Sequence, residues 1–556
     1  REPVHRRGRR RRHHRGRIPV EQRKGGPVTS GQQEHPNGKQ QTPSDQQSRS
    51  IVVILCDQLR PDFLTVYGGG GVPPPHINRL ADSGVVFENA ITQSTVCAPA
   101  RATMMTGRYV SDHGVWTNDV PFREGLDYLA ERMNRLGYRT GAFGKLHHYP
   151  AADAKGFSVA HQMEEGRLGD EEPYLKWLKE RHPEVSGVWN IENNRFAFDE
   201  SEYHEHWIAD RAIDFIRETP IEDPLLAWVS FQGPHTPYAP PRAVEGSSDS
   251  LSTQAPLPLS EDAETDLPGA VRYRRAAGPM PSESTETMNN RIRYCELIVE
   301  IDRQIGRVLS ALESTGRLES ATVLFSADHG DLLGDFDIKA KGPYPYPGQM
   351  DIPLVLSNHP GVEAGSRSEA LVGNIDIPGT CLAIAGDDEP IGHSISLLDQ
   401  IADRGAAPAR PYIFSEFCDS AKTVDDGRFR LTYYPFEGAR LLFDRTVDPQ
   451  CTRNLAGSPE HAETELRLFG AIIDSMVVAK GVRIEAHDFV PAVQSGLRAV
   501  VPHFVHQFPV AFPISAAERR ALKNAGLDTQ LNEVFRGRPV LRSYTPPYWE
   551  DASDRE

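Results

Sequence analysis

Charged or polar side chains follow four apolar segments of this sequence, at the point where each segment ends. They are Asp57 and Gln58, Lys145 and His147, His235, and Asp328 and His329. A single Asp after a strand is more often a turn former than a functional group. In open α/β sheets, however, ligands bind outside the carboxyl ends of the strands. Four such segments together therefore predict one site at one edge of a sheet.

These residue types suit a divalent cation together with a tetrahedral anion. Asp57, Asp328 and the amide oxygen of Gln58 are hard oxygen ligands of the kind that Ca²⁺, Mg²⁺ and Mn²⁺ prefer. His329 either adds a nitrogen ligand or is a structural histidine. Five further side chains could surround the outer oxygens of the anion: Arg101, Lys145, His147, His235 and Lys341. A metal and cations in this arrangement stabilise the charge that develops in sulfuryl or phosphoryl transfer.

A cysteine motif, Cys97-Ala98-Pro99-Ala100-Arg101, lies where a helix is predicted to begin, near Pro99. From the residues alone, Cys97 is a buried structural thiol, a nucleophile or the precursor of another group. The chain has 6 cysteines, and none of them forms a close pair or a CxxC motif. A disulfide scaffold or a zinc ribbon is therefore not expected.

Continuous apolar, β-branched runs predict the buried strands of a parallel sheet. These strands are expected at 51–55, 138–145, 224–235 and 321–330. Helical patterns lie between them, at 124–136, 204–218 and 289–314. The alternation predicts an α/β fold for residues 51–405, with a large, mostly parallel sheet sandwiched by helices. Short strands and turns predict a smaller antiparallel α+β subdomain at 406–480.

Three further segments carry separate expectations. Residues 1–50 contain few large apolar side chains and are expected to form a disordered basic tail. Residues 246–287 are rich in Ser, Pro and acidic residues, which predicts a surface excursion or a long loop. Residues 481–556 are too apolar for free coil, so we expect this tail to pack on the body or on a partner subunit of a homo-oligomer.

Charge is unevenly distributed along the chain. The formal net charge is −16, but residues 1–50 hold 13 Lys and Arg against 4 Asp and Glu. The tail therefore carries +9 and the rest of the chain −25, which argues against nucleic acid as a partner. No run approaches the roughly 18 apolar residues of a membrane span, so no membrane association is expected. The first residues lack the apolar core of a secretory signal, which predicts a cytoplasmic location.

The cysteine motif and the segment after it, ATMMTGRYVSDHG, resemble the signature of the type I sulfatases, which belong to the alkaline phosphatase superfamily. Other segments resemble this family in the same order along the chain: ILCDQ, GKLH, GPHTPY, DHGDLLGD with KAKGP, and LLFDRTVDPQCTRNLAG. The resemblance covers residues 51–455. It implies an alkaline phosphatase-like fold and the hydrolysis of sulfate esters to an alcohol and inorganic sulfate.

The resemblance also implies that a formylglycine-generating enzyme oxidises Cys97 to Cα-formylglycine. The hydrate of this aldehyde would attack sulfur, form a covalent sulfo-enzyme intermediate and then expel sulfate. One divalent metal is implied, with Ca²⁺ expected and Mn²⁺ or Mg²⁺ as alternatives. Its ligands would be Asp57, Gln58, the converted Cys97, Asp328 and His329.

Roles for the remaining residues follow from the same resemblance. Arg101 would position the nucleophile, Lys145 would contact the ester oxygens, and His147 would take a proton from the hydrate. His235 and Lys341 would lie near the leaving oxygen, where one of them is the general acid. A further residue, Asn118, would contact the sulfate or phosphate group.

Two departures widen the choice of substrate. Gln58 and His329 stand where many sulfatases have Asp and Asn. At both positions the chain resembles choline sulfatases and phosphonate monoester hydrolases instead. The expected substrate is a small-molecule or saccharide sulfate ester, favoured by the intact Lys145-x-His147 pair. A phosphonate monoester or phosphodiester hydrolase on the same site is the alternative. A third hypothesis is an unmodified, catalytically silent binding protein.

Overall fold

The computed structural model describes residues 49–69, 72–248, 256–257, 267–277, 279–402 and 410–478. The predicted tails at 1–50 and 481–556 lie outside these residues, except for Arg49 and Ser50. Those two belong to the folded body: Ser50 begins strand β1, and Arg49 donates a hydrogen bond to the Ala321 carbonyl at 2.9 Å. The fold thus starts two residues before the predicted boundary, because strand pairing continues past the end of the apolar run.

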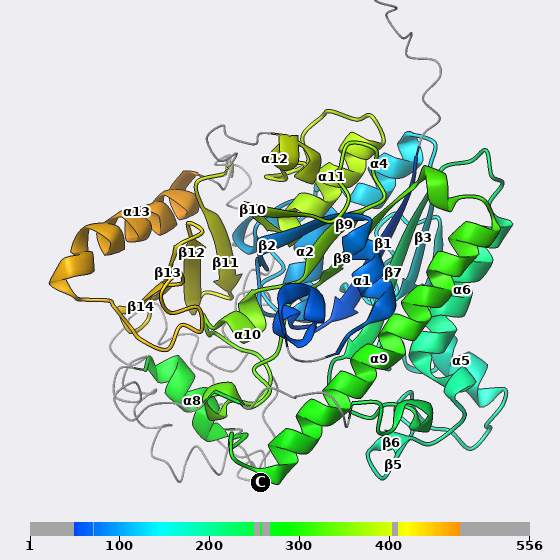
Figure 1. The fold of residues 1–556 in the computed structure, drawn as a ribbon, viewed down its shortest axis with the longest axis horizontal. Coiled ribbons are helices and arrows are strands. Elements are labelled where there is room, and N and C mark those ends of the chain that lie inside the picture. Colours follow the sequence, from blue (N-terminus) through cyan, green and yellow to red (C-terminus); the bar gives the residue numbers. More distant parts are fainter. Residues whose placement is uncertain are drawn as a thin grey trace, which may run out of the picture. The chain divides into compact units, whose positions relative to one another are not determined.

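The main sheet has eight strands within the described residues, in the order β10-β2-β9-β8-β1-β7-β3-β4 (Figure 1). Their bounds are β1 Ser50–Asp57, β2 Gly84–Ile91, β3 Arg139–Gly144, β4 Val159–Gln162, β7 Leu225–Pro234, β8 Ala321–Ala327, β9 Leu354–Ser357 and β10 Ser366–Gly373. Strand β9 runs antiparallel to both of its neighbours, and the other pairings are parallel. The predicted α/β class with a mostly parallel sheet is confirmed.

The four strands expected from the sequence are adjacent in this sheet, in the order β8-β1-β7-β3. Every residue of β1 is buried, and Val53 pairs with Leu324 on one side and Trp228 on the other. A strand between two parallel neighbours has both faces covered by helices, so a continuous apolar run is what it requires. Their shared direction brings four carboxyl ends to one edge of the sheet.

Two groups of helices cover the sheet (Figure 1). The first group contains α9 Thr285–Ser314, which contacts both α1 Pro75–Asp82 and α6 His204–Glu218. The second contains α2 Cys97–Thr106, α4 Leu129–Arg135 and α11 Ile377–Ile384. The shorter helices are α3 Val110–His113, α5 Pro173–Lys179, α10 Pro347–Met350 and α12 Leu397–Ala402. Among the residues that the structure describes, no helix is long and apolar enough to cross a bilayer.

Helix α2 begins at Cys97 and ends at a glycine that the packing requires. Gly107 has φ 63°, and a Cβ at this position would lie 2.3 Å from the Ile391 carbonyl oxygen. A left-handed residue in so close an approach has to be glycine. The helix starts two residues earlier than the predicted start near Pro99, so Cys97 itself lies in its first turn.

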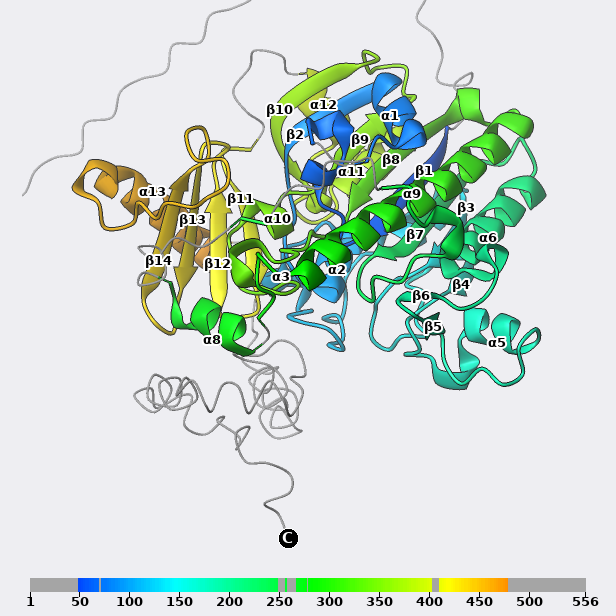
Figure 2. The same cartoon turned by 60° about the horizontal axis from the view of Figure 1, so that its bottom comes forward.

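A separate antiparallel sheet follows the main one in the chain (Figure 2). Its strands are β11 Ile413–Phe417, β12 Ala421–Asp425, β13 Phe429–Tyr434 and β14 Ala439–Asp444, and helix α13 Ala462–Val478 packs on β12 and β13. Leu468 and Ile472 of the helix form a buried cluster with Val424 and Leu431. A short hairpin, β5 Ile191–Glu192 with β6 Arg195–Phe196, stands apart from both sheets.

The segment at 246–287, expected to be a loop, contains helix α8 Gly269–Ala277. Val271 and Tyr273 of this helix are buried, and the N–H groups of Gly269 and Ala270 donate to the Glu437 carboxylate. The composition of the whole segment concealed the helix, because the Ser-rich and Pro-rich residues on either side dominate the local pattern.

Candidate active site

Side chains from four adjacent strand ends meet at one edge of the main sheet. Asp57 ends β1, Lys145 follows β3, His235 follows β7 and Asp328 follows β8. The pairing of β1 with β7 shifts between Cys56 and Asp57, and the chain then turns sharply at Gln58, whose φ is 69°. This turn places the side chains of Asp57 and Gln58 at the carboxyl edge of the sheet.

Four buried side chains form a compact group of possible metal ligands: Asp57, Cys97, Asp328 and His329. Each offers one ligand atom, and these atoms all lie within 4.8 Å of one another. Cys97 Sγ is 3.7 Å from Asp57 Oδ1 and 3.2 Å from His329 Nε2. We call this group and the cations around it the Cys97 site.

His329 presents the correct nitrogen to this group. Its Nδ1 lies 2.8 Å from the Gly330 carbonyl oxygen, so Nδ1 carries the hydrogen and Nε2 faces the cluster with a lone pair. Burial lowers the pKa of His329 to about 4, which keeps the ring neutral at physiological pH. A neutral imidazole is the form that binds metals.

Gln58 provides a test of whether the site fits a cation. Its backbone N–H donates to Asp328 Oδ1 at 3.0 Å, and its side-chain Nε2 donates to Asp331 Oδ2. The remaining atom, Oε1, is buried and has no hydrogen-bond partner among the described residues. An unsatisfied buried acceptor costs about 1–3 kcal/mol. A cation bound to this oxygen removes that cost, so the donor set of the site fits a divalent metal.

Arg101 ties the two carboxylates of the cluster together. The guanidinium is buried and donates through Nε to Asp328 Oδ2 at 2.9 Å and through Nη2 to Asp57 Oδ2 at 3.2 Å. Nη1 donates to the Lys145 carbonyl at 2.6 Å and to Ser230 Oγ at 2.7 Å. With its donors committed on all sides, Arg101 is a rigid support for the acids rather than a free anion receptor.

Two lysines complete the charge balance. Lys145 Nζ is 2.6 Å from Asp57 Oδ2, and Lys341 Nζ is 2.7 Å from Cys97 Sγ and 3.0 Å from His329 Nε2. Burial by itself would raise the pKa of Asp57, but Lys145, His235 and Arg101 hold it well below its ordinary value. The site thus keeps the Asp57 carboxylate ionised although it is buried.

The two histidines on the cationic side differ in their surroundings. His147 is buried, its Nδ1 has no partner among the described residues, and burial together with Arg167 and Lys145 holds its pKa well below the ordinary value. A neutral imidazole with an open nitrogen suits the role of a base. His235 is partly exposed, with Nδ1 2.5 Å from the Thr236 carbonyl oxygen.

Asn118 lies at the start of α2. Its Oδ1 accepts a hydrogen bond from the Ala98 N–H at 3.2 Å. The first N–H groups of a helix need such an acceptor, so one function of Asn118 is to support the turn that contains Cys97. The structure therefore places all the predicted site residues in or beside one region, with Asn118 at its margin.

Three acidic residues of this region were not expected from the sequence: Glu164, Glu165 and Asp331. Glu164 accepts hydrogen bonds from the backbone N–H groups of Leu146 and His147, at 2.7 and 3.1 Å. Asp331 follows the Asp328-His329-Gly330 segment directly, a position that could have drawn notice. Glu164 and Glu165 lie beyond β4, where nothing in the local pattern signals a site.

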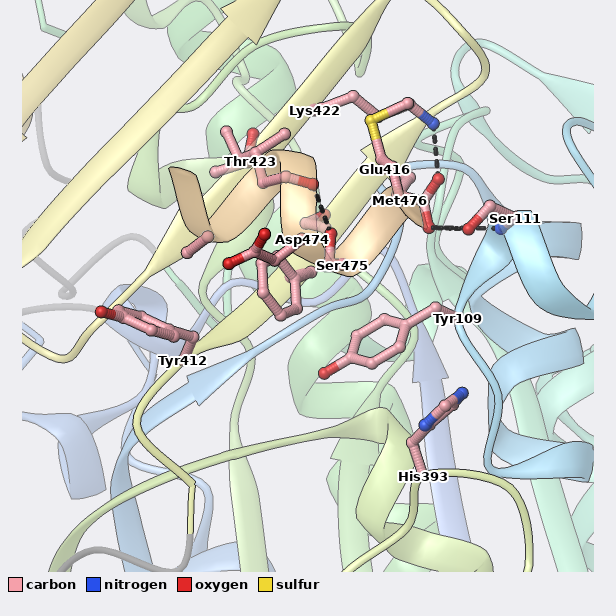
Figure 3. A pocket seen from close by; sticks show the side chains of 14 residues that line it. Tyr109, Ser111, His393, Tyr412, Glu416, Lys422, Thr423, Asp474, Ser475 and Met476 are labelled. Carbon is pink, nitrogen blue, oxygen red and sulfur yellow. Dashed lines mark hydrogen bonds and ion pairs between the residues drawn. The ribbon is translucent and has the colours of Figure 1, made fainter. Parts of the chain in front are cut away.

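A cavity of about 820 Å³ lies elsewhere, between α3, β11, β12 and α13 (Figure 3). We call it the C-terminal cavity; its lining includes Tyr109, His393, Tyr412, Phe414, Ile472 and Met476. Its main buried charges are already paired: Glu416 accepts from Lys422 Nζ at 2.5 Å and from Ser111 Oγ at 2.8 Å. None of the residues predicted to be functional lines it.

Known proteins that resemble this chain match it over the residues that form the Cys97 site. A model of the sulfatase family matches residues 49–387. An arylsulfatase of Clostridium perfringens is 27% identical over 449 residues, covering 74% of this chain and 91% of the relative. A choline-sulfatase of Rhizobium meliloti is 25% identical over 436 residues, covering 74% and 83%. In fold, the chain is similar to a phosphonate monoester hydrolase from Silicibacter pomeroyi, with a TM-score of 0.68 at 24% identity, covering 79% of this chain and 97% of that one.

Proposed function

Since the chain belongs to the sulfatase family, we propose that it hydrolyses sulfate esters through a formylglycine hydrate formed from Cys97. Membership of this family, with relatives named arylsulfatase and choline-sulfatase, makes the protein a sulfuric ester hydrolase. The observation that carries the mechanism is the place of Cys97: the first turn of α2, with Sγ in contact with His329 and Lys341. A cysteine that only fills space in the core would be surrounded by apolar side chains, whereas Cys97 contacts a histidine and a lysine.

The metal is part of the same proposal. Asp57, Gln58, Asp328, His329 and the converted Cys97 would hold one divalent cation. Ca²⁺ suits the oxygen donors best, with Mn²⁺ or Mg²⁺ as alternatives. A bound divalent metal lowers the pKa of a hydroxyl group and neutralises the charge of a sulfate ester.

The chain's own residues carry the first half of the reaction. Lys145 and Lys341 bind the sulfate oxygens, while Arg101 holds the supporting acids in place. One hydroxyl of the converted Cys97 attacks the sulfur and gives up its proton, which passes to solvent. The bond from sulfur to the leaving oxygen breaks, and its electron pair stays on that oxygen. His235 or Lys341 gives a proton to that oxygen, so the alcohol departs neutral and the enzyme retains a covalent sulfate ester.

The second half restores the aldehyde. His147, neutral and with an open Nδ1, takes the proton of the remaining hydroxyl. The carbonyl group re-forms as the bond from carbon to the sulfate oxygen breaks, and inorganic sulfate leaves. Water then adds to the aldehyde and regenerates the hydrate. A plain thiol has no second hydroxyl and therefore cannot release sulfate in this way.

We propose a small-molecule or saccharide sulfate ester as the substrate, and a formylglycine-generating enzyme as the partner during maturation. The cytoplasmic location, the homo-oligomer and the absence of nucleic-acid or membrane partners stay predictions from the sequence. A phosphonate monoester or phosphodiester is the alternative substrate, favoured by Gln58, His329 and Asn118 and compatible with the fold.

Two measurements test these choices. Mass spectrometry of the Cys97 peptide, after coexpression with a formylglycine-generating enzyme, should show the aldehyde; a free thiol there would support a silent binding protein instead. For the converted enzyme, kcat/KM should be higher for an aryl sulfate than for a phenyl phosphonate monoester. A preference of more than about tenfold for the phosphonate, equivalent to about 1.4 kcal/mol in barrier, would reverse the choice of substrate.

A further inference from the structure

Glu165 places a carboxylate inside a site that is built to bind an anion. Its Oε1 accepts a hydrogen bond from Lys145 Nζ at 2.8 Å and lies 3.8 Å from His235 Nδ1. Its Oε2 accepts from Arg167 Nη1 at 2.8 Å. The side chain is 14% exposed, at the partly open side of the site where His235 also lies. A negative charge here would repel a sulfate ester unless it served another group.

The turn that contains Glu165 does not depend on this side chain. Glu172 accepts the N–H groups of Glu164 and Gly166 at 2.9 and 2.7 Å, and so holds the turn from both sides. Glu164 in turn fixes the backbone of the Lys145–His147 segment. The Glu165 carboxylate itself contacts cationic or titratable groups: Lys145, Arg167 and His235. Glu172 therefore holds the turn, and the Glu165 carboxylate is left to interact with groups of the site.

The position of His235 indicates what that role is. Nδ1 lies against the Thr236 carbonyl oxygen, so Nδ1 is a protonated nitrogen and Nε2 is the atom available to a substrate. The Glu165 carboxylate, 3.8 Å from Nδ1, faces the ring on the side away from Nε2 and would balance its positive charge when Nε2 also carries a proton. The other candidate donor, Lys341, is already in contact with Cys97 and His329.

We propose that Glu165 is a positioning residue that holds His235 as the proton donor to the leaving oxygen. This inference rests on the proposed sulfatase function. In the step concerned, the bond from sulfur to the leaving oxygen breaks and its electron pair stays on that oxygen. The proton on His235 Nε2 moves to the oxygen, the alcohol departs, and His235 remains neutral until it takes a proton from solvent.

The test compares substrates that need a proton donor to different degrees. Phenyl sulfate has a poor leaving group, whereas 4-nitrophenyl sulfate releases a phenol acidic enough to leave without protonation. In the metal-loaded, formylglycine-converted enzyme, Glu165→Gln should lower kcat/KM about 100-fold for phenyl sulfate and less than about threefold for 4-nitrophenyl sulfate. An equal loss on both substrates, or no loss on either, would overturn the proposal.

Two control variants distinguish the role of Glu165 from a general effect of charge or folding. Glu171→Gln changes an exposed acid of the same region, which forms an ion pair with Lys176, and it should alter neither rate. Glu165→Asp keeps the charge on a shorter side chain and should raise the ratio of the two rates by a smaller factor. If Glu165→Gln does not fold, an unchanged ratio in Glu165→Asp overturns the proposal. A converted wild-type enzyme that hydrolyses neither ester would contradict the proposed function instead.

Discussion

The Cys97 site and the C-terminal cavity are both lined by buried polar groups, but they satisfy those groups in opposite ways. In the cavity, Glu416 already has its partners in Lys422 and Ser111 (Figure 3). His393 Nε2 has no hydrogen bond among the described residues but lies 3.4 Å from Asp112 Oδ2. In the Cys97 site, Gln58 Oε1 and His147 Nδ1 are buried without a partner among the described residues. The buried acid of the cavity is thus paired within the protein, whereas the Cys97 site leaves two buried polar atoms that a ligand could satisfy.

The difference shows that space alone does not identify a functional site. A cavity of about 820 Å³ is large enough for a small molecule, yet its buried acid, Glu416, is already paired with Lys422. The character of the Cys97 site comes from convergent charges with unsatisfied buried atoms. Substitutions in the Cys97 site should therefore lower activity, whereas substitutions in the C-terminal cavity should lower stability.

The largest expected effect is on catalysis. Cys97→Ala removes the precursor of the nucleophile and should lower kcat/KM for an aryl sulfate by at least about 10⁵-fold, with the fold retained. Phe414→Ala, in the C-terminal cavity, should leave kcat/KM within about twofold. Steady-state kinetics with purified, metal-loaded proteins measures both. If Phe414→Ala were as inactive as Cys97→Ala, the conclusion that only the Cys97 site takes part in catalysis would be wrong.

The next effect is on stability and belongs to the cavity. Lys422→Met leaves the Glu416 carboxylate buried without its cation, which should cost about 3 kcal/mol of the free energy of unfolding. Urea denaturation measures this loss, and kcat/KM of the remaining folded protein should not change. Lys176→Met, at an exposed ion pair with Glu171, is the matched control and should shift stability by less than about 0.5 kcal/mol.

A third prediction concerns the metal. Asp331 accepts hydrogen bonds from Gln58 Nε2 and, at 2.6 Å, from the Tyr238 hydroxyl, so it decides which way the Gln58 amide points. Asp331→Asn should turn or loosen that amide and weaken Ca²⁺ binding about 10- to 100-fold. Calorimetric titration of metal-free protein measures the affinity directly. Asp337→Asn, in the same loop but partly exposed, should bind Ca²⁺ as the wild type does.

The smallest expected effect is a dependence of stability on pH. Burial, reinforced by Lys155, lowers the pKa of His148 to about 3, so the folded protein keeps this ring neutral. The unfolded chain takes up a proton near the ordinary pKa of about 6.5, so acid favours the unfolded state between these two values.

The test of this dependence uses a neutral replacement. His148→Gln should lose about 1.4 kcal/mol less stability than the wild type when the pH is lowered from about 7.5 to 5.5. Chemical denaturation at the two pH values measures the difference. His461→Gln, at a partly exposed position near α13, should follow the wild type. Identical acid sensitivity in the wild type and His148→Gln would show that this ring is not a source of it.

Local patterns were sufficient for much of the fold and for most of the candidate site. The apolar runs predicted β1, β3, β7 and β8 because a strand buried on both faces has to be apolar along its whole length. The order in which they lie, and the reversed direction of β9, were not predictable, because strand neighbours are chosen by contacts far apart in the chain. The helix α8 was missed for a related reason, since a short helix in a polar segment is stabilised by its packing.

The same division holds within the site. The sequence alone determined the family, the cysteine motif and the side chains that follow the strands, since these depend on residue type and spacing. Only the tertiary structure decided that Asp331 orients Gln58, that Glu172 supports the turn of Glu165, and that Glu165 faces His235. Such contacts join side chains from separate elements, and their energies depend on distance and burial, which no local pattern contains.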